Sequence, residues 1–484
     1  MLKESVRFIL KDTAIYGIAG GLSKFLALLT LPIIVKNIST ADFGIWNLLT
    51  LIGSIISSVL IFGMDSSVVR YYYDSESLEH KKNVFSQGLF FQLILFLCFA
   101  VFGFFIPELF LSFVNVDNSY SNDLLLVFLW IPANILTQYF QNWFKWTFQR
   151  IQFLLLSAGL AVLNLSILYY GYRTNFLNLK TVLLINTISC WIFALLGLWW
   201  CRNYLRFRID KILMKKLAIF GFPMMLVMLV GMLSSSLDRL FLAQNLSPEN
   251  LGIYSLSQKL SIIMLVVVAA FQIAFGPFLF SNWDRPEAKK TIARFQSYYI
   301  IVIGIIAIII CSFGKNLVLI IGSEEYLGAE KVLPYLIFGV VLYGLYSFAS
   351  IGIFYAKKMF INLLALSCGF SINLILNLIL SPYFLEYGVA FGFVFGNLVL
   401  IAAAYIFSKQ YYPVNFSFVK DTLALIFLFF ILSFINISIV ENIWEDAIIK
   451  AFLCLLIFIP ISVLLLQKEE KKYITDFLKF NKGE

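Results

Sequence analysis

Residues 36–56 read KNISTADFGIWNLLTLIGSII, and residues 244–264 read QNLSPENLGIYSLSQKLSIIM. The two stretches align without a gap at an offset of 208 residues, and six of the 21 aligned positions are identical, including Gly44 and Gly252. Each copy crosses a short polar loop and opens a long apolar segment. Because an even number of apolar segments separates the copies, the repeat is parallel. It predicts two lobes of the same orientation that face a central cleft.

The apolar segments are too numerous for a water-soluble core. Of the 484 residues, 61% are hydrophobic and 13% are charged, whereas soluble domains average about 45–50% and about 25%. Runs of about 20 apolar residues indicate membrane helices, because a helix satisfies its own backbone hydrogen bonds in lipid. The predicted spans are 13–35, 43–63, 84–107, 123–144, 151–171, 178–200, 217–243, 251–281, 296–313, 332–355, 360–380, 385–408, 419–439 and 445–466.

These spans predict an all-α polytopic membrane protein with about 14 transmembrane helices. We expect helices 1–6 to form the first lobe over residues 1–210 and helices 7–12 to form the second over residues 211–415. A C-terminal helix pair, helices 13–14, and a cytoplasmic tail would occupy residues 416–484. The loops between the spans are too short for a folded soluble domain, which excludes a soluble enzyme on a membrane anchor.

The basic residues test this arrangement. The chain has 36 Lys and Arg and a net charge of +9. When loops are assigned to alternate sides, 27 of these residues lie on the side of the two termini, six on the other side and three within spans. Because loops rich in Lys and Arg stay in the cytoplasm, both termini are predicted to be cytoplasmic. Topology explains the basic charge, so no nucleic-acid partner is expected.

Residues suited to catalysis or metal binding are scarce in the sequence. The six cysteines lie far apart in apolar runs, without metal or redox spacing, and are expected to be buried hydrophobic residues. The single histidine, His80, lies in the polar run 74–82. The sequence has no catalytic triad, phosphate-binding Gly-rich loop or carboxylate cluster. We therefore expect no catalytic residue, no metal site and no cofactor.

The three basic residues within spans are Lys24, Arg239 and Lys259. Each costs about 2.5–3.5 kcal/mol near a helix centre in lipid. Small residues precede them at helical spacing, which indicates faces turned toward protein or water. Asp238 offsets only one of the three, so a cleft that they line would be cationic and would suit an anionic ligand such as a phosphate. Asn47 begins an uncharged polar stripe on the second helix.

Most of these residues also have a structural interpretation. Arg239 or Lys259 could pair with Asp238 as a structural ion bridge. Asn47 could hydrogen-bond to a neighbouring helix. Arg70, which three tyrosines follow, could anchor the chain at the membrane interface.

Four segments carry a resemblance to a known family. They are 39-STADFGIWNLL-49, 63-GMDSSVVRYYYD-74, 235-SSLDRLFLAQNLSPENLGIYSLSQKL-260 and 332-VLPYLIFGVVLYGLYS-347. In order and spacing, over nearly the full chain, they resemble the polysaccharide-transporter (Wzx-type flippase) branch of the multidrug/oligosaccharidyl-lipid/polysaccharide exporter superfamily. The segment 235–260 is the most specific of the four.

The resemblance implies a protein of the bacterial cytoplasmic (inner) membrane that works by alternating access. It would flip undecaprenyl-pyrophosphate-linked oligosaccharide repeat units to the outer leaflet for O-antigen, capsule or exopolysaccharide synthesis. Its partners would be this polyprenyl-linked substrate and membrane lipid, with H⁺ or Na⁺ as candidate coupling ions. Helices 13–14 would shelter the polyprenyl tail. We expect a monomer, since one chain can enclose the cleft.

The resemblance also selects substrate-binding residues. Arg70, Asp238, Arg239 and Lys259 occupy charged positions of its motifs. Lys24 joins them on the physical argument alone. The cations would draw in the pyrophosphate or acidic sugars, and Asp238 would hold Arg239 or Lys259 in place.

The polar stripe that Asn47 begins would meet sugar hydroxyls. Asn47 therefore completes the predicted set of substrate-binding residues.

Three other classes of protein remain as alternatives. An ion-coupled multidrug exporter of the same superfamily would need an intramembrane carboxylate, for which Asp238 is the candidate. A lipid II flippase would use the same cationic cleft. A membrane enzyme of polysaccharide synthesis ranks third, because it would need a larger outer loop.

Overall fold

The computed structural model describes residues 23, 25–234, 236–282, 287–356 and 358–465. Within these ranges every regular element is a helix, which confirms the all-α polytopic class. The chain forms two compact units, Met1–Gly252 (unit 1) and Ile253–Glu484 (unit 2), and each is described by itself. The lobe boundaries at residues 210 and 415, which rest on the repeat, stay predictions.

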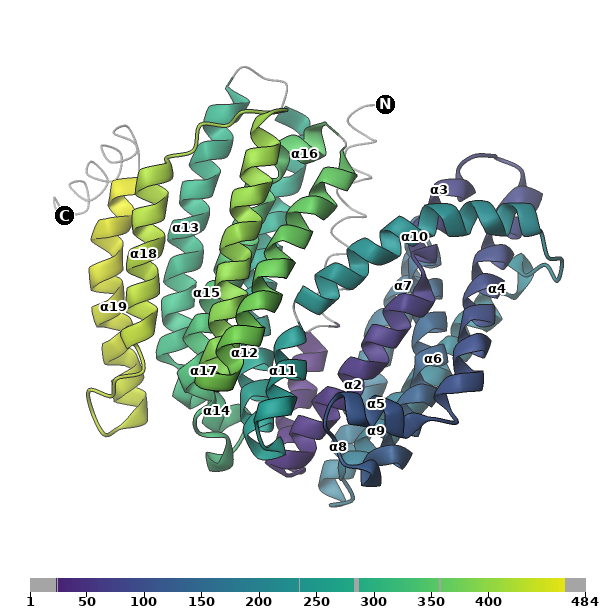
Figure 1. The fold of residues 1–484 in the computed structure, drawn as a ribbon, viewed down its shortest axis with the longest axis horizontal. Helices are drawn as coiled ribbons and strands as arrows, with labels where there is room; N and C mark the ends of the chain where they lie inside the picture. The colour runs from purple at the N-terminus through teal and green to yellow at the C-terminus, as the bar shows by residue number, and fades with distance from the viewer. Residues whose placement is uncertain (1–22, 24, 235, 283–286, 357, 466–484) are drawn as a thin grey trace. The chain divides into compact units, whose positions relative to one another are not determined.

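Unit 1 is built around α6 (Ser121–Trp146), which packs against α2 (Thr40–Ile61) and α9 (Leu179–Cys201) (Figure 1). Phe128 and Ile131 of α6 are fully buried because helical spacing puts them on the face that meets α2. The other helices of this unit are Phe25–Val35, α3 (Met64–Tyr72), α4 (Leu78–Gly103), α5 (Pro107–Phe113), α7 (Arg150–Leu154), α8 (Leu160–Arg173), α10 (Lys211–Ser234) and α11 (Leu237–Asn245).

The turn between α2 and α3 explains part of the 63–74 motif. Phe62 and Gly63 both have left-handed backbone conformations, with φ of 52° and 65°. A Cβ atom on Gly63 would lie 2.3 Å from the carbonyl oxygen of Gly221 in α10, so only glycine fits there. The hydroxyl of Ser67 donates a hydrogen bond to the carbonyl oxygen of Leu217 at 3.0 Å. The first half of the 63–74 motif therefore packs α3 against α10.

The two copies of the repeat meet at equivalent residues. A Cβ atom on Gly44 would lie 2.4 Å from the carbonyl oxygen of Pro248, and one on Gly252 would lie 2.0 Å from the carbonyl oxygen of Thr40. Thr40 and Pro248 are themselves related by the repeat offset of 208. The contact is therefore reciprocal. It brings the backbones of α2 and the first turn of α12 (Pro248–Asn282) into direct contact.

Unit 2 is built around α15 (Ala329–Ala349), the most enclosed of its long helices, which packs against α13 (Ala288–Ser312) and α17 (Met359–Lys409) (Figure 1). Leu385, with φ of 48°, interrupts α17 between the predicted helices 360–380 and 385–408. The other helices of this unit are the remainder of α12, α14 (Gly314–Ile321), α16 (Ile351–Tyr355), α18 (Phe418–Phe434) and α19 (Ile443–Leu465).

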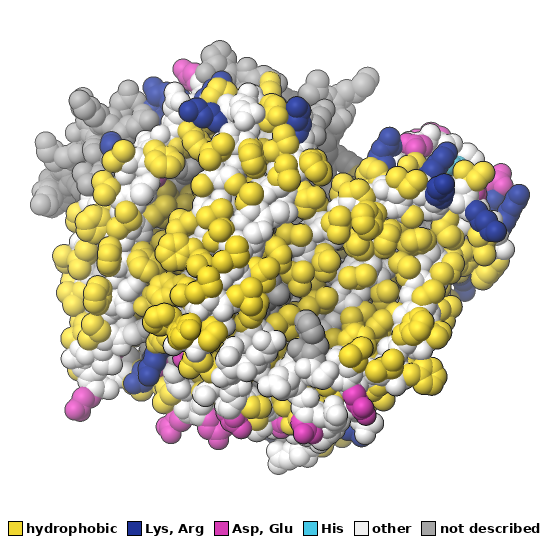
Figure 2. All heavy atoms as spheres, in the orientation of Figure 1, with side chains coloured by type: hydrophobic (Ala, Val, Ile, Leu, Met, Phe, Trp, Pro, Cys, Tyr) yellow, Lys and Arg dark blue, Asp and Glu magenta, His cyan; other side chains and the backbone are white. Residues whose placement is uncertain are grey.

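Eleven helices in the described part of the chain are long and apolar enough to cross a membrane. One of them, 360–409, contains two predicted spans, and the apolar helix α18, with 17 residues, is shorter than these eleven. The total of fourteen crossings therefore stays a prediction. Hydrophobic side chains cover the flank of each unit, and Lys and Arg gather toward one end of it (Figure 2). This distribution is typical of a multi-pass membrane protein.

Candidate functional site

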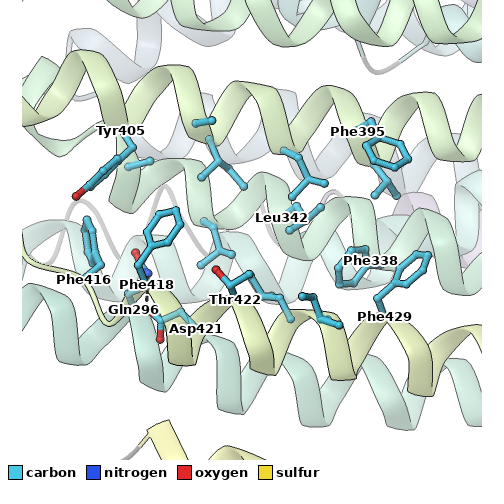
Figure 3. Close-up of a pocket in the computed structure, with 18 of the residues that line it drawn as sticks. Gln296, Phe338, Leu342, Phe395, Tyr405, Phe416, Phe418, Asp421, Thr422 and Phe429 are labelled. Atoms are coloured by element: carbon cyan, nitrogen blue, oxygen red, sulfur yellow. Dashed lines mark hydrogen bonds between the residues drawn. The ribbon is translucent and has the colours of Figure 1, made fainter.

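One cavity of unit 2 is a groove between α15, the second half of α17 and α18. Its volume is about 840 Å³. Phe338 of α15 and Phe429 of α18 lie side by side along it, and Phe395 of α17 lies on the opposite side (Figure 3). The rings of Phe338 and Phe429 pack at 5.2 Å between centroids. The walls are almost entirely apolar, so the groove suits a hydrocarbon ligand.

The groove is open along its side. Phe395 is 49% exposed and Ile406 is 59% exposed, and both line the groove from α17. Ala402, between them on the same helix, is also exposed and has the smallest side chain of the three. Large apolar residues exposed on a membrane helix face lipid. A hydrocarbon chain can therefore enter the groove sideways from the bilayer.

One end of the groove is polar. The carboxylate of Asp421, in the first turn of α18, is 4% exposed. The amide of Gln296 donates a hydrogen bond to it at 2.8 Å, and the hydroxyl of Ser297 donates another at 3.2 Å (Figure 3). Tyr405 and Phe418 close the same end, with ring centroids 6.0 Å apart. The groove thus joins a long apolar channel to a small polar, aromatic end.

Sequence reasoning missed the residues of this groove. It predicted that helices 13–14 shelter the polyprenyl tail; α18, the first helix of that pair, lines the groove and α19 does not, and the place of the tail stays a prediction. The groove is lined by α18 together with α15 and α17, which precede α18 by up to about a hundred residues in the chain. Outside the groove, α18 packs against α19 and α13. The only feature of the sequence that could have indicated this groove was the carboxylate of Asp421, inside the predicted span 419–439.

The predicted substrate-binding residues lie elsewhere. Lys24 falls outside the described residues. Asn47 in α2 is fully buried, and its amide nitrogen donates to the carbonyl oxygen of Phe43 at 2.7 Å. Its side-chain oxygen has no hydrogen-bond partner among the described residues. That oxygen can therefore still accept a hydrogen bond within the membrane-spanning part of unit 1.

The polar stripe that follows Asn47 is bonded mainly to its own helix. The hydroxyls of Thr50, Ser54 and Ser58 each donate to the carbonyl oxygen four residues earlier. Ser58 also contacts the sulfur of Met232 in α10 at 3.0 Å. The hydroxyl protons are therefore satisfied, and the oxygens keep lone pairs for another donor.

Asp238 and Arg239 lie side by side in the first turn of α11. The carboxylate of Asp238 is buried and accepts from the backbone nitrogen of Arg239 at 2.9 Å. A guanidinium nitrogen of Arg239 donates to the hydroxyl of Ser236 at 3.3 Å. The next residue, Leu240, packs against the apolar core that α2 and α6 share. This core holds the charged turn against α2.

Arg70 and Lys259 lie on other helices, α3 and α12. Arg70 lies in the last turn of α3, largely exposed, and its guanidinium is 2.5 Å from the carboxylate of Asp74. Lys259 lies half-buried in α12, within unit 2. Within unit 1, Asp238 and Arg239 share the first turn of α11, and the substrate-binding role of the whole set stays a prediction.

Two all-helical units, whose long helices are apolar enough to cross a membrane, define a multi-pass membrane protein. The chain belongs to the polysaccharide biosynthesis protein family, whose model matches residues 9–283, more than half of its length. It is 20% identical over 335 residues to "Lsg locus putative protein 1" of Haemophilus influenzae, covering 66% of this chain and 79% of that protein.

Solved structures share the fold. A structure titled "Lipid II flippase MurJ, inward closed conformation" matches with a TM-score of 0.66 at 17% identity, over 92% of this chain and 98% of that one. An inward-facing multidrug resistance MATE family transporter of the MOP superfamily matches with a TM-score of 0.58 at 14% identity, over 82% and 94%. These comparisons confirm the resemblance to this superfamily. The two solved structures with this fold are titled as a flippase and a transporter.

Proposed function

We propose that this protein flips a lipid-linked saccharide across the bacterial cytoplasmic membrane. The substrate would be an undecaprenyl-pyrophosphate-linked oligosaccharide repeat unit, moved from the cytoplasmic to the outer leaflet. The observation that carries the proposal is the laterally open groove in a member of a polysaccharide biosynthesis family. A flippase must shield a polar headgroup from about 30 Å of hydrocarbon while the tail stays in lipid.

The groove would guide the polyprenyl tail. Transfer of a tail from the bilayer to an apolar groove gains little hydrophobic free energy, because lipid is already apolar. Selectivity must therefore come from van der Waals packing along the aromatic walls. Phe338, Phe395 and Phe429 supply those walls. Their rigid rings would favour a branched isoprenoid chain that fills the space between them.

The charged turn of α11 would bind the pyrophosphate. Arg239 offers a guanidinium that can contact a phosphate through two parallel hydrogen bonds. Asp238 would orient it, and Lys24 and Lys259 would add positive charge. Asn47 would contact the sugar, and Arg70 would attract the headgroup before entry. A purely structural pairing of Asp238 with a neighbouring cation is the alternative that mutation must exclude.

Alternating access would use the contact between the repeats. The backbones of Gly44 and Gly252 meet near the starts of α2 and α12, next to the loops that lead into these helices. The distribution of Lys and Arg supports an outer location for both loops and cytoplasmic termini. A monomer would suffice, with H⁺ or Na⁺ as the coupling ion.

A lipid II flippase is the second candidate. The MurJ structure matches this chain with a higher TM-score than the MATE transporter does. Lipid II is also a polyprenyl pyrophosphate, so the same groove and the same cations would serve it. The two substrates differ in the headgroup alone, which the tail groove cannot distinguish.

The test is a substrate panel in proteoliposomes. Purified protein would be reconstituted with a labelled undecaprenyl-pyrophosphate oligosaccharide, with lipid II or with a cationic dye. Flipping is measured as the fraction of headgroup that becomes accessible to an added glycosidase. We expect oligosaccharide flipping above that of protein-free vesicles. Dye efflux without flipping would overturn the proposal in favour of a multidrug exporter, and flipping of lipid II alone would favour the second candidate.

A further inference from the structure

A second pocket of unit 2 lies at the end opposite the Lys-rich loops. It has a volume of about 490 Å³ and is formed by α14 and the start of α19. Asn316 and Ile320 line it from α14, and Glu441, Asn442 and Trp444 line it from the turn before α19 and its first residues. By the predicted topology this end of the unit is the outer one. The tail groove has no lining residue in common with this pocket.

The wall of this outer pocket contains a buried amide with open hydrogen-bonding capacity. Asn316 is 3% exposed, and neither its amide nitrogen nor its oxygen has a hydrogen-bond partner among the described residues. Burying such a group without a partner costs about 1–3 kcal/mol. The amide therefore keeps donor and acceptor capacity that no described residue uses.

The mouth of the pocket is aromatic and acidic. Trp444 is 55% exposed, and its indole packs against the ring of Phe313 at 6.5 Å between centroids. The carboxylates of Glu441 and Glu445 are exposed beside it. An anchor at the membrane interface would explain Trp444 but not the buried amide of Asn316. The negative charge disfavours phosphates and uronic acids.

The turn that carries Trp444 is held rigidly. The carboxylate of Asp446 accepts hydrogen bonds from the backbone nitrogens of Ile439 at 2.6 Å and Val440 at 3.2 Å. Its other oxygen pairs with the ammonium of Lys450 at 2.6 Å, with both side chains buried. The side chain of Asn442 accepts from the backbone nitrogen of Trp444. A pocket fixed in this way loses little conformational entropy when it binds a ligand.

We propose that this outer pocket binds a neutral saccharide. A sugar presents adjacent hydroxyls, or an acetamido group, that can both donate to and accept from the amide of Asn316. Its C–H face can stack on the exposed indole of Trp444, and the carboxylate of Glu441 can accept a further hydroxyl. The volume has room for one or two sugar residues. In a flippase, this pocket would retain the saccharide headgroup after it has crossed the membrane. That role rests on the proposed function, whereas the binding of a neutral saccharide does not.

The test is direct binding to the full-length protein in phosphatidylcholine nanodiscs, which avoids detergents with sugar headgroups. The probes are N-acetylglucosamine, lactose and glucuronic acid, measured by saturation-transfer NMR and titration. We expect millimolar binding of the two neutral sugars and at least fivefold weaker binding of glucuronic acid. Absence of neutral-sugar binding, or equally tight binding of glucuronic acid, would overturn the proposal.

Three variants test whether the neutral sugars bind in this pocket. Asn316→Leu and Trp444→Ala should each weaken neutral-sugar binding at least tenfold. Trp199→Ala, at a tryptophan with the same 55% exposure in unit 1, should leave it unchanged. Asn316→Leu should keep or raise the Tm, because it removes a buried amide without partners, so lost binding would not reflect unfolding. Unchanged affinity in both pocket variants would refute the assignment.

The same variants separate this proposal from the proposed function. If the wild-type protein flips the oligosaccharide and the pocket variants bind sugar normally, the pocket proposal fails and the flippase stands. If sugar binding depends on Asn316 and Trp444 but no lipid-linked saccharide is flipped, the pocket stands and the proposed function fails.

Discussion

The contact between the repeats makes a quantitative prediction for Gly252→Ala. The added methyl group would lie 2.0 Å from the carbonyl oxygen of Thr40, whereas ordinary contacts begin at 3.4 Å. The backbones of α2 and α12 would have to separate by roughly 1.4 Å to relieve the overlap. Overpacking of this kind costs about 1–3 kcal/mol. With roughly 2–4 °C per kcal/mol for a unit of this size, we expect the Tm to fall by several degrees.

Gly231→Ala is the matched control. Gly231 is exposed in α10 of the same unit, and a Cβ atom built on it would meet nothing within 4 Å. Alanine is favoured over glycine in a helix by about 1 kcal/mol, so this variant should keep or raise the Tm. The difference between the two variants isolates the contact from the effect of helix propensity.

The assay is thermal unfolding of the purified protein in nanodiscs, followed by tryptophan fluorescence. The double variant Gly44→Ala with Gly252→Ala should lose less stability than the sum of the single variants, because both substitutions disturb one contact. Equal Tm values for Gly252→Ala and Gly231→Ala would refute the reasoning. Full additivity of Gly44→Ala and Gly252→Ala would refute the reciprocal contact.

Three further predictions concern the groove and the Lys-rich end of unit 1. Ala402→Trp should fill the groove and lower flipping at least tenfold in the proteoliposome assay. Leu378 is exposed on the first half of α17 and lies outside the groove, so Leu378→Trp should leave the flipping rate unchanged. Asp421→Leu should lower the Tm, because the hydrogen-bond donors of Gln296 and Ser297 lose their acceptor, which costs about 1–3 kcal/mol of stability. Asp421→Asn keeps a side-chain oxygen and should retain much of the stability. Equal losses of Tm in the two variants would contradict this prediction. Hydrogen bonds from the backbone nitrogen of Leu213 and the amide of Asn83 hold the pKa of Asp210 below its usual range. That contribution to stability is present above the unfolded pKa of about 3.9 and is lost as pH falls through the lower folded value. Between pH 6 and pH 3 the wild type should therefore lose more stability than Asp210→Asn, as measured by Tm; parallel losses would contradict the assignment.

The helical layout was accessible from the sequence because apolar runs and turn residues are local signals. The turn between the second predicted helix and the 63–74 motif lies at Gly63, where a left-handed backbone and a close approach to Gly221 both require glycine. The break between the predicted helices 360–380 and 385–408 lies at Leu385.

The groove and the outer pocket were not accessible, because each arises from helices far apart in the chain. Asp421 is one carboxylate in an apolar run, and only the fold shows that Gln296 and Ser297 are its donors. Asn316 lies in a short helix whose sequence gives no sign that its amide is buried without a partner among the described residues. Residue types indicate chemistry, but three-dimensional packing decides which residues share a cavity.

The most direct test of the central claim is photo-crosslinking of the substrate tail. An undecaprenyl-pyrophosphate oligosaccharide with a benzophenone in its tail would be irradiated with the reconstituted protein, and the adducts mapped by mass spectrometry. We predict adducts concentrated in residues 338–349, 391–406 and 416–430, with competition by unlabelled substrate. Adducts spread evenly over the lipid-facing helices, or equal labelling by a benzophenone phospholipid at the same positions, would contradict the account.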